Sequence, residues 1–376
     1  MQTHRERVRC ALDFQQPDRV PLDLGGRVSN IHIEAYRRLA SCLGVSLQME
    51  ELDPFYSVME IAPAILERLG IDCYYLYLRG PEYLRRQTFS DGSYENEWGI
   101  RIEQLGHFSQ RVTHPLAEVE KAALNHYPWP DPLRPERTEG LRERARFLYE
   151  ETDYALVAAP VSGGLFEFGQ HLRGMQNFLM DLLLNKSWAH LLLDHLLQIQ
   201  TGLWQVYLDS VGPYVEMVQL ADDFGTQTSL LISPALFREF FKPRYTELIR
   251  FIRGRTNAKV FFHCDGAIIP IIPDLMEMGV DVLNPLQPGA QGMNPGAIKA
   301  LYGDKLVFHG AIDNQKLLPQ GTPSEVRTRV RQVVQILAPG GGYILAPAHV
   351  IEPDIPVENI LAMYDSAREI NLQRKS

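Results

Sequence analysis

The chain has 376 residues, of which 45% are hydrophobic and 22% charged, and its formal net charge is −9. This composition is typical of a globular protein with a large core. The negative charge and the lack of a long basic run argue against nucleic acid and anionic membranes as main partners, and without an apolar run of about 18 residues we expect no membrane span.

Short apolar runs alternate with amphipathic segments along most of the chain. The eight predicted strands are residues 19–24 (RVPLDL), 73–78 (CYYLYL), 154–160, 214–225, 259–266, 280–287, 306–313 and 343–349. Helical patterns separate them, such as residues 323–339 (PSEVRTRVRQVVQILAP), whose apolar residues recur on one helix face.

Eight strand–helix units predict an α/β fold, the (β/α)8 TIM barrel, as one domain spanning residues 1–376. The strands are apolar, as expected of parallel strands that helices cover. An open doubly wound sheet is the alternative. It would carry a glycine-rich phosphate loop after its first strand, and the Gly-Gly-Arg segment there is too short.

A segment after the second predicted strand departs from this alternation. Residues 88–106 (TFSDGSYENEWGIRIEQLG) contain an Asp-Gly dipeptide and partial alternation around a tryptophan, which predicts an inserted β-hairpin. The proline-rich residues 126–135 (HYPWPDPLRP) that follow are expected to form an extended connector.

The cysteines and the amino-terminal segment indicate the cellular compartment. Cys10, Cys42, Cys73 and Cys264 match no zinc-ribbon or Cys-x-x-Cys spacing, and so few cysteines indicate reduced thiols. The first residues, MQTHRERVRCALDF, are charged and amphipathic, without the apolar stretch of a signal peptide. We therefore expect a cytoplasmic protein.

Polar, mostly ionisable residues follow seven of the eight predicted strands. They are Arg27, Arg79, Asp222 with Asp223, His263 with Asp265, Gln287, His309 with Asp313, and His349. The carboxyl ends of barrel strands build the active site, so the pattern predicts a charged pocket, although strand ends are polar in any case. The candidate catalytic residues are Asp222, Asp223, His263 and His349. The candidate substrate contacts are Arg27, Arg79, Gln287, His309 and Asp313.

Residues 259–266 (KVFFHCDG) carry the most distinctive polar cluster. Side chains alternate across a strand, so His263 and Asp265 should face one side and Cys264 the helix layer. His349, after the eighth run, could supply a third ligand. Two imidazoles and one carboxylate with an open position are a usual set for catalytic zinc. A hydrogen-bonded structural histidine is the alternative.

Asp222 and Asp223 are adjacent, so only one of them should face the pocket. That carboxylate could serve as a general acid or base, or orient substrate beside an arginine, and we favour the second role. Arg27 and Arg79 could bind substrate carboxylates in bidentate fashion. Alternatively, the two arginines pair with Asp222 or Asp313.

Five stretches of the chain carry a resemblance to a known family. They are PDRVPLDLGGR, QLADDFGTQTSLLISPALFREFFKPRY, FFHCDGAIIPIIPDLMEMGVDVLNPLQ, HGAIDNQKLLPQGTPSEV and APAHVIEPDIPVENI. In this order and spacing, the chain resembles the uroporphyrinogen decarboxylase superfamily over nearly its full length. The resemblance implies the same (β/α)8 barrel.

The decarboxylases of this superfamily remove carboxylates from porphyrinogen side chains without metal or cofactor. The chain resembles them at Arg27, His349 and residues 310–313 (GAID). It differs at Arg79, where they carry an aspartate that pairs with pyrrole N–H groups, since an arginine has donors only. Their arginine-rich opening motif is also reduced to Gly-Gly-Arg. Both departures argue against true decarboxylase activity.

The resemblance is closer to the methyltransferases that work with methyl-corrinoid proteins. Members with known metal sites use His-x-Cys after the fifth strand and Cys or His after the eighth. Here the pattern reads His263-x-Asp265 and His349, with the cysteine displaced to Cys264, and aspartate is an acceptable zinc ligand. The resemblance thus implies zinc and a corrinoid (cobalamin) on a partner protein, which the hairpin and connector could dock.

We therefore predict a metal-dependent methyltransferase that moves a methyl group between a corrinoid protein and a small thiol, methyl ether or amine. A homodimer is expected for such an enzyme. Two alternatives remain. One is a metal-free decarboxylase of a porphyrinogen-like polycarboxylate, with Arg27 and His349 recognising carboxylates. The other is a non-enzymatic protein that binds a tetrapyrrole or corrinoid.

Overall fold

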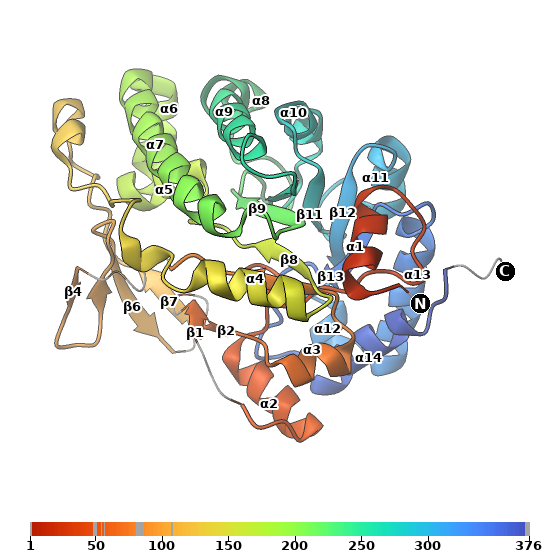
Figure 1. Cartoon of the computed structure of the whole chain (residues 1–376). Helices are drawn as coiled ribbons and strands as arrows, with labels where there is room; N and C mark the ends of the chain where they lie inside the picture. Colours follow the sequence, from red (N-terminus) through yellow and green to blue (C-terminus); the bar gives the residue numbers. More distant parts are fainter. Residues whose placement is uncertain are drawn as a thin grey trace.

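The centre of the molecule is a curled parallel sheet (Figure 1). The computed structural model describes residues 2–372 except 48–50, 54, 56, 80–83, 85 and 107. In spatial order the seven strands are β13 (Tyr343–Pro347), β12 (Val307–Ile312), β11 (Val282–Leu286), β10 (Lys259–His263), β9 (Met217–Ala221), β8 (Ala155–Ala158) and β3 (Cys73–Leu76). The second to eighth predicted runs are therefore strands of one α/β sheet.

The first predicted run, residues 19–24, is not a full strand. Leu22 forms a single parallel bridge with Leu345. The Asp23 N–H donates to Leu345 O over 2.9 Å, and on the other side the Asp72 N–H donates to Leu22 O over 2.8 Å. The segment thus forms hydrogen bonds to β13 and to Asp72, the residue before β3. Strands β13 and β3 are the two edges of the sheet. The segment stays short because Pro21 has no N–H to donate.

Helix α1 (His4–Leu12) packs against the inner face of the sheet. Its Val8, Ala11 and Leu12 form one buried cluster with alternate residues of the strands. The strand residues of this cluster are Cys73, Tyr75, Ala155, Val157, Met217, Phe261, Val282, Val307 and Ile344, and Ala159, just after β8, joins them. Most of them lie toward the amino-terminal part of their strands. The carboxyl-terminal end is thereby left for polar residues.

Asp72 connects α1 to the sheet through buried ion pairs. Its carboxylate lies 2.7 Å from guanidinium nitrogens of both Arg7 and Arg19, and 2.6 Å from His4 Nδ1. Burial raises the pKa of Asp72, but His4, Arg19 and Arg7 outweigh it, so the pKa is lowered. The ionised carboxylate therefore stabilises the folded state.

We expect Asp72→Asn to lower the free energy of unfolding by about 3–5 kcal/mol, because it removes the buried charge that faces Arg7 and Arg19 and leaves Arg7 with Asp18 as its remaining partner. The folded-state pKa lies below the unfolded value of about 3.9, so this contribution is present above that pH and is lost as pH falls through the folded pKa. Urea unfolding at several pH values measures both effects. The exposed pair Arg331–Glu369 supplies the control, since Glu369→Gln should cost at most about 1 kcal/mol. Equal losses in the two variants would contradict this prediction.

Helices cover the outer face of the sheet (Figure 1). They are α2 (Ile33–Leu43), α3 (Pro63–Leu69), α4 (Leu141–Glu151), α5 (Leu165–Arg173), α6 (Met175–Leu184), α7 (Lys186–Val211), α8 (Pro234–Leu236), α9 (Lys242–Arg253), α10 (Ile272–Met278), α11 (Pro295–Tyr302), α12 (Leu317–Gln320), α13 (Pro323–Leu337) and α14 (Val357–Arg368). The predicted apolar face of residues 323–339 is buried in α13. No helix in the described part of the chain has the length and apolarity that a membrane crossing needs.

The insert between β3 and α4 is larger than the predicted hairpin, which is corrected here. Strands β4 (Gln87–Thr88), β5 (Tyr94–Glu95), β6 (Arg101–Leu105) and β7 (Phe108–Arg111) form a four-stranded antiparallel sheet (Figure 1). The Asp-Gly turn joins only β4 and β5. A separate antiparallel pair is formed by β1 (Glu51–Asp53) and β2 (Val58–Met59). Since the insert follows β3, it starts from the carboxyl-terminal end of the parallel sheet.

Candidate metal centre

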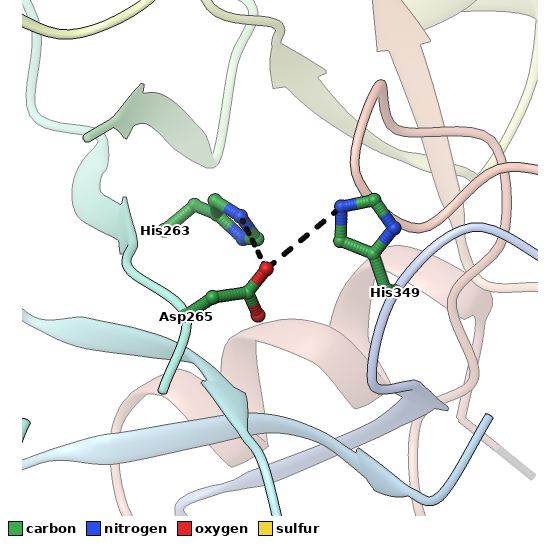
Figure 2. Close-up of side chains that lie close together, drawn as sticks. All are labelled: His263, Asp265 and His349. Carbon is green, nitrogen blue, oxygen red and sulfur yellow. Dashed lines mark ion pairs between the residues drawn. The ribbon is translucent and has the colours of Figure 1, made fainter. Parts of the chain in front are cut away.

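His263, Asp265 and His349 converge at the carboxyl-terminal end of the sheet (Figure 2). His263 ends β10, and His349 follows β13. The Nε2 atoms of His263 and His349 lie 3.8 Å and 3.9 Å from Asp265 Oδ2. One ligand atom from each residue lies within 4.8 Å of the others. Tetrahedral zinc ligands at about 2.1 Å would lie roughly 3.4 Å apart, so small side-chain shifts would let the three bind one ion.

Cys264 faces away from these three residues. Its side chain is fully buried in the apolar core, and its Sγ accepts a hydrogen bond from the Phe224 N–H over 3.4 Å. Burial raises the pKa of the Cys264 thiol well above its usual value. This is the arrangement that strand alternation predicts, and it leaves the trio with nitrogen and oxygen donors.

A series of buried hydrogen bonds begins at His263 Nδ1, the ring nitrogen that points away from Asp265. His263 Nδ1 lies 2.5 Å from Asn284 Oδ1, and Asn284 Nδ2 lies 2.8 Å from His309 Nδ1. His309 Nε2 in turn lies 2.8 Å from Asp23 Oδ2. Asn284, His309 and Asp23 are fully buried. Strand register explains the contact, because His263 is paired with Asn284 on the neighbouring strand.

The donor and acceptor of each hydrogen bond in this series can be assigned, starting from Asp23. The Asp23 carboxylate accepts from the Tyr75 hydroxyl over 2.7 Å and from His309 Nε2–H. His309 Nδ1 therefore accepts from the Asn284 amide nitrogen. The Asn284 oxygen then accepts from His263 Nδ1–H, which fixes the tautomer with the Nε2 lone pair on the side of Asp265. A metal-binding histidine needs this tautomer.

The trio also shifts the pKa values of its own members. Burial lowers the pKa of His263, but the Asp265 and Asp223 carboxylates and the Asn284 hydrogen bond raise it, and the net shift is upward. Burial raises the pKa of Asp265 against the opposing effect of His263 and His349. The site therefore holds protons to higher pH than usual, and a divalent cation would compete with those protons.

Asp222 and Asp223 occupy different environments. The buried Asp222 carboxylate accepts from the N–H groups of Phe166 (2.8 Å) and Glu167 (2.9 Å) in the first turn of α5, and from the Tyr245 hydroxyl (2.7 Å). Burial raises the pKa of Asp222 to about 8, while these hydrogen bonds oppose the rise. Asp222 thus anchors α5 and is not paired with an arginine.

Asp223 is the carboxylate that faces the trio. Its side chain is 47% exposed, and its Oδ1 lies 3.7 Å from His263 Nε2. The same oxygen accepts a hydrogen bond from the Asp265 N–H over 2.9 Å. Asp223 therefore braces the backbone of a candidate ligand and remains reachable from the pocket.

Gly164 makes room for the contact between Asp222 and α5. A Cβ at position 164 would lie 2.0 Å from Asp222 Cγ, so Gly164→Ala must displace the carboxylate from the helix. We expect this substitution to cost about 1–3 kcal/mol of unfolding free energy, measured by chemical denaturation. At Gly296, in α11, the nearest atom to an added Cβ is 3.4 Å away, so Gly296→Ala should be neutral or stabilising. A neutral Gly164→Ala would show that the Asp222 contact is unimportant for stability.

A solvent-open pocket of about 670 Å³ lies beside His263 and His349. Its other lining residues are Arg27, Val28, Phe55, Arg111, Pro160, Ser162, Gly163, Glu167, Phe168, Ala221, Asp222 and Asp223. Sequence reasoning missed Arg111, Glu167, Phe168 and Phe55. The Ser-Gly-Gly segment after β8 could have pointed to Glu167 and Phe168, whereas Arg111 lies in the insert and carries no such signal.

Four predicted substrate contacts, Arg79, Gln287, Asp313 and His309, do not line this pocket. Arg79 is half-exposed and pairs with Glu139 over 2.8 Å, because β3 ends three residues earlier. Gln287 accepts from the Gly266 N–H over 2.8 Å. Asp313 accepts from the N–H groups that follow it in its own turn. His309 is fully buried within the hydrogen-bond chain behind His263.

The parallel α/β sheet with a charged pocket at its carboxyl-terminal end is an enzyme-like architecture. The family model of uroporphyrinogen decarboxylase (URO-D) matches residues 108–370, more than half of the chain. The chain belongs to this family, as the sequence resemblance predicts. The matched residues include His263, Asp265 and His349, whereas Arg27 precedes them.

Curated relatives carry two kinds of names. The chain is 24% identical to uroporphyrinogen decarboxylase of Coxiella burnetii over 186 residues, and so spans about half (48%) of that relative's length. It is 22% identical to the uroporphyrinogen decarboxylase of Alkalilimnicola ehrlichii over 386 residues, 97% of this chain and 94% of the relative. It is also 23% identical over 228 residues to methylated-thiol–coenzyme M methyltransferase of Methanosarcina mazei, 60% of this chain and 57% of that one.

A solved structure shares the whole fold. A methyltransferase from Methanosarcina mazei superposes with a TM-score of 0.69, covering 98% of this chain and 99% of that one. Sequence identity is 19%. The fold of the complete chain is therefore that of this methyltransferase, including the parts outside the family match.

Proposed function

We propose that this chain is a metal-dependent methyltransferase on a (β/α)8 barrel, moving a methyl group between a small substrate and a corrinoid carried by a partner protein. The observation that carries the proposal is the convergence of His263, Asp265 and His349 beside an open pocket. The similarity to a methylated-thiol–coenzyme M methyltransferase adds support.

The residues of the pocket have separate roles in this proposal. His263, Asp265 and His349 would hold zinc, which when bound favours the anionic form of a thiol or polarises a methyl ether oxygen. Asn284 presents the Nε2 lone pair of His263 to the site. Asp223, exposed and 3.7 Å from His263, is placed to accept a proton from the substrate. Phe168 supplies an apolar wall that limits water in the pocket.

Methyl transfer from free methylcobalamin to a thiol tests the proposal. The thiolate takes the methyl group, and the cobalt retains the bonding electron pair and becomes Co(I), which changes the absorbance. We expect turnover with zinc-loaded protein, loss of turnover after chelation and its return when zinc is restored. Turnover that persists after complete removal of metal would contradict the proposal.

A metal-free decarboxylase of a polycarboxylate is the second candidate. It is favoured by the relative that aligns over 97% of the chain and by the presence of Arg27 and His349 in one pocket. Against it, Arg79 stands where those enzymes carry their key aspartate, and its side chain pairs with Glu139 outside the pocket. Decarboxylation of uroporphyrinogen that survives chelation would favour this candidate over methyl transfer.

A further inference from the structure

The inserted antiparallel sheet contributes a cation to the pocket. Arg111 is the last residue of β7, and its side chain lines the pocket with Arg27, Glu167 and the candidate ligands His263 and His349. The insert starts from the carboxyl-terminal end of the parallel sheet, so its far strand can reach over the site. Neither the strand pattern nor the family motifs point to this residue.

Arg111 is held by an aromatic ring and not by a carboxylate. Its guanidinium carbon lies 3.9 Å from the centroid of the Phe55 ring, a distance at which a cation and an aromatic face attract each other. Among the described residues, no carboxylate lies within 4.0 Å of Arg111. Glu167 also lines the pocket and lies 3.6 Å from His171. The guanidinium donors thus remain available to a ligand.

The pocket is therefore lined by two chemically different groups of residues. One group is His263 and His349, beside which a methyl group would be exchanged. The other is Arg111 with the apolar rings of Phe55 and Phe168. A planar guanidinium matches a carboxylate or a sulfonate through paired, charge-assisted hydrogen bonds. A neutral ligand would leave this cation without a partner.

We propose that Arg111 binds an anionic group of the substrate, so that the methyl donor or acceptor is a small carboxylate or sulfonate whose reacting atom lies beside His263 and His349. This inference rests on the proposed methyl transfer for the identity of the reacting end. It makes Arg111 a specificity-determining residue supplied by the insert, and Phe55 the residue that positions its guanidinium.

Calorimetric titration of the zinc-loaded full chain tests this with matched probes. These are 3-(methylthio)propionate, 3-(methylthio)propane-1-sulfonate and the uncharged 3-(methylthio)propanamide. We expect at least one anion to bind roughly tenfold to a hundredfold more tightly than the amide, the effect of a hydrogen bond to a charged group. The tighter of the two anions identifies the group. Equal binding of both anions and the amide, or no binding of either anion, would overturn the proposal.

Variants of Arg111 assign the effect to this residue. Arg111→Gln should abolish the preference for the anion and leave binding of the amide unchanged, while Arg111→Lys should retain part of it. Arg101, on the neighbouring strand β6, pairs with Asp91 over 2.6 Å and does not line the pocket. Arg101→Gln makes the same charge change and should keep the preference. An anion preference that survives Arg111→Gln would contradict the assignment.

Zinc content measured on the same preparations separates this inference from the proposed function. If the chain retains no zinc but prefers an anion through Arg111, methyl transfer fails and the anion site stands. If the chain retains zinc but Arg111→Gln binds both kinds of probe like the wild type, the anion site fails and methyl transfer stands.

Discussion

Asp265→Ala should lower the affinity of the chain for zinc at least about 100-fold, because even hydrogen-bond partners of metal ligands are worth about 10–100-fold. Asp265 Oδ2 lies between the two imidazoles, 3.8 Å from His263 Nε2 and 3.9 Å from His349 Nε2. Its loss leaves only two neutral donors in the trio and removes the one charged ligand. Competition with a chromophoric chelator measures the affinity.

Two neighbouring residues provide matched controls for this experiment. Cys264→Ser changes the residue next to Asp265, but the Cys264 side chain is buried in the core on the other side of the strand. Asp223→Ala removes a carboxylate that lies outside the trio and accepts from the Asp265 N–H, so it should weaken zinc binding less than Asp265→Ala does. Cys264→Ser should retain zinc. Loss of zinc from Cys264→Ser would show that a thiolate is a ligand, which the alternation of side chains excludes.

Asn284→Leu should weaken zinc binding about 10–100-fold, although Asn284 is no ligand itself. Without the amide oxygen, nothing holds the proton on His263 Nδ1, and the imidazole is free to take the other tautomer or rotate. The leucine also leaves the buried His309 Nδ1 without its donor. Nitrogen chemical shifts of His263 in the metal-free chain report the tautomer directly, a readout that a general loss of stability would not move.

Gln219 offers a control for this second prediction. Its amide is also fully buried, on β9, and neither of its polar atoms has a hydrogen-bond partner among the described residues. Gln219→Leu therefore makes the same chemical change in a similar environment without touching the chain behind His263. It should leave zinc affinity unchanged. If both leucine variants weaken zinc binding equally, the hydrogen-bond chain has no specific role.

The central sheet could be predicted from the sequence because its strands are continuous apolar runs that amphipathic helical segments separate clearly. The alternation of side chains predicts the inward face of His263 and the buried position of Cys264, because β10 is regular up to His263. The sequence does not reveal that Asn284 is the partner of His263, because the two residues meet only through the pairing register of neighbouring strands. Asp23, at the far end of the hydrogen-bond chain, is 286 residues from His309.

The errors have physical causes that a single sequence does not display. The first predicted run contains Pro21 and forms only one bridge, between Leu22 and Leu345. Its apolar pattern therefore predicts a longer strand than the structure has. The Asp-Gly turn predicts only the β4–β5 hairpin, because β6 and β7 carry no comparable turn signal. Arg79, after the second predicted strand, pairs with Glu139 at the surface, whereas Arg111, at the end of the insert, lines the pocket.

X-ray absorption at the zinc edge of the zinc-loaded chain tests the central claim most directly. Ligation by His263, Asp265 and His349 predicts only nitrogen and oxygen neighbours at about 2.0–2.2 Å, with the outer-shell scattering of two imidazoles. A sulfur neighbour at about 2.3 Å, or a chain that retains no zinc, would contradict it.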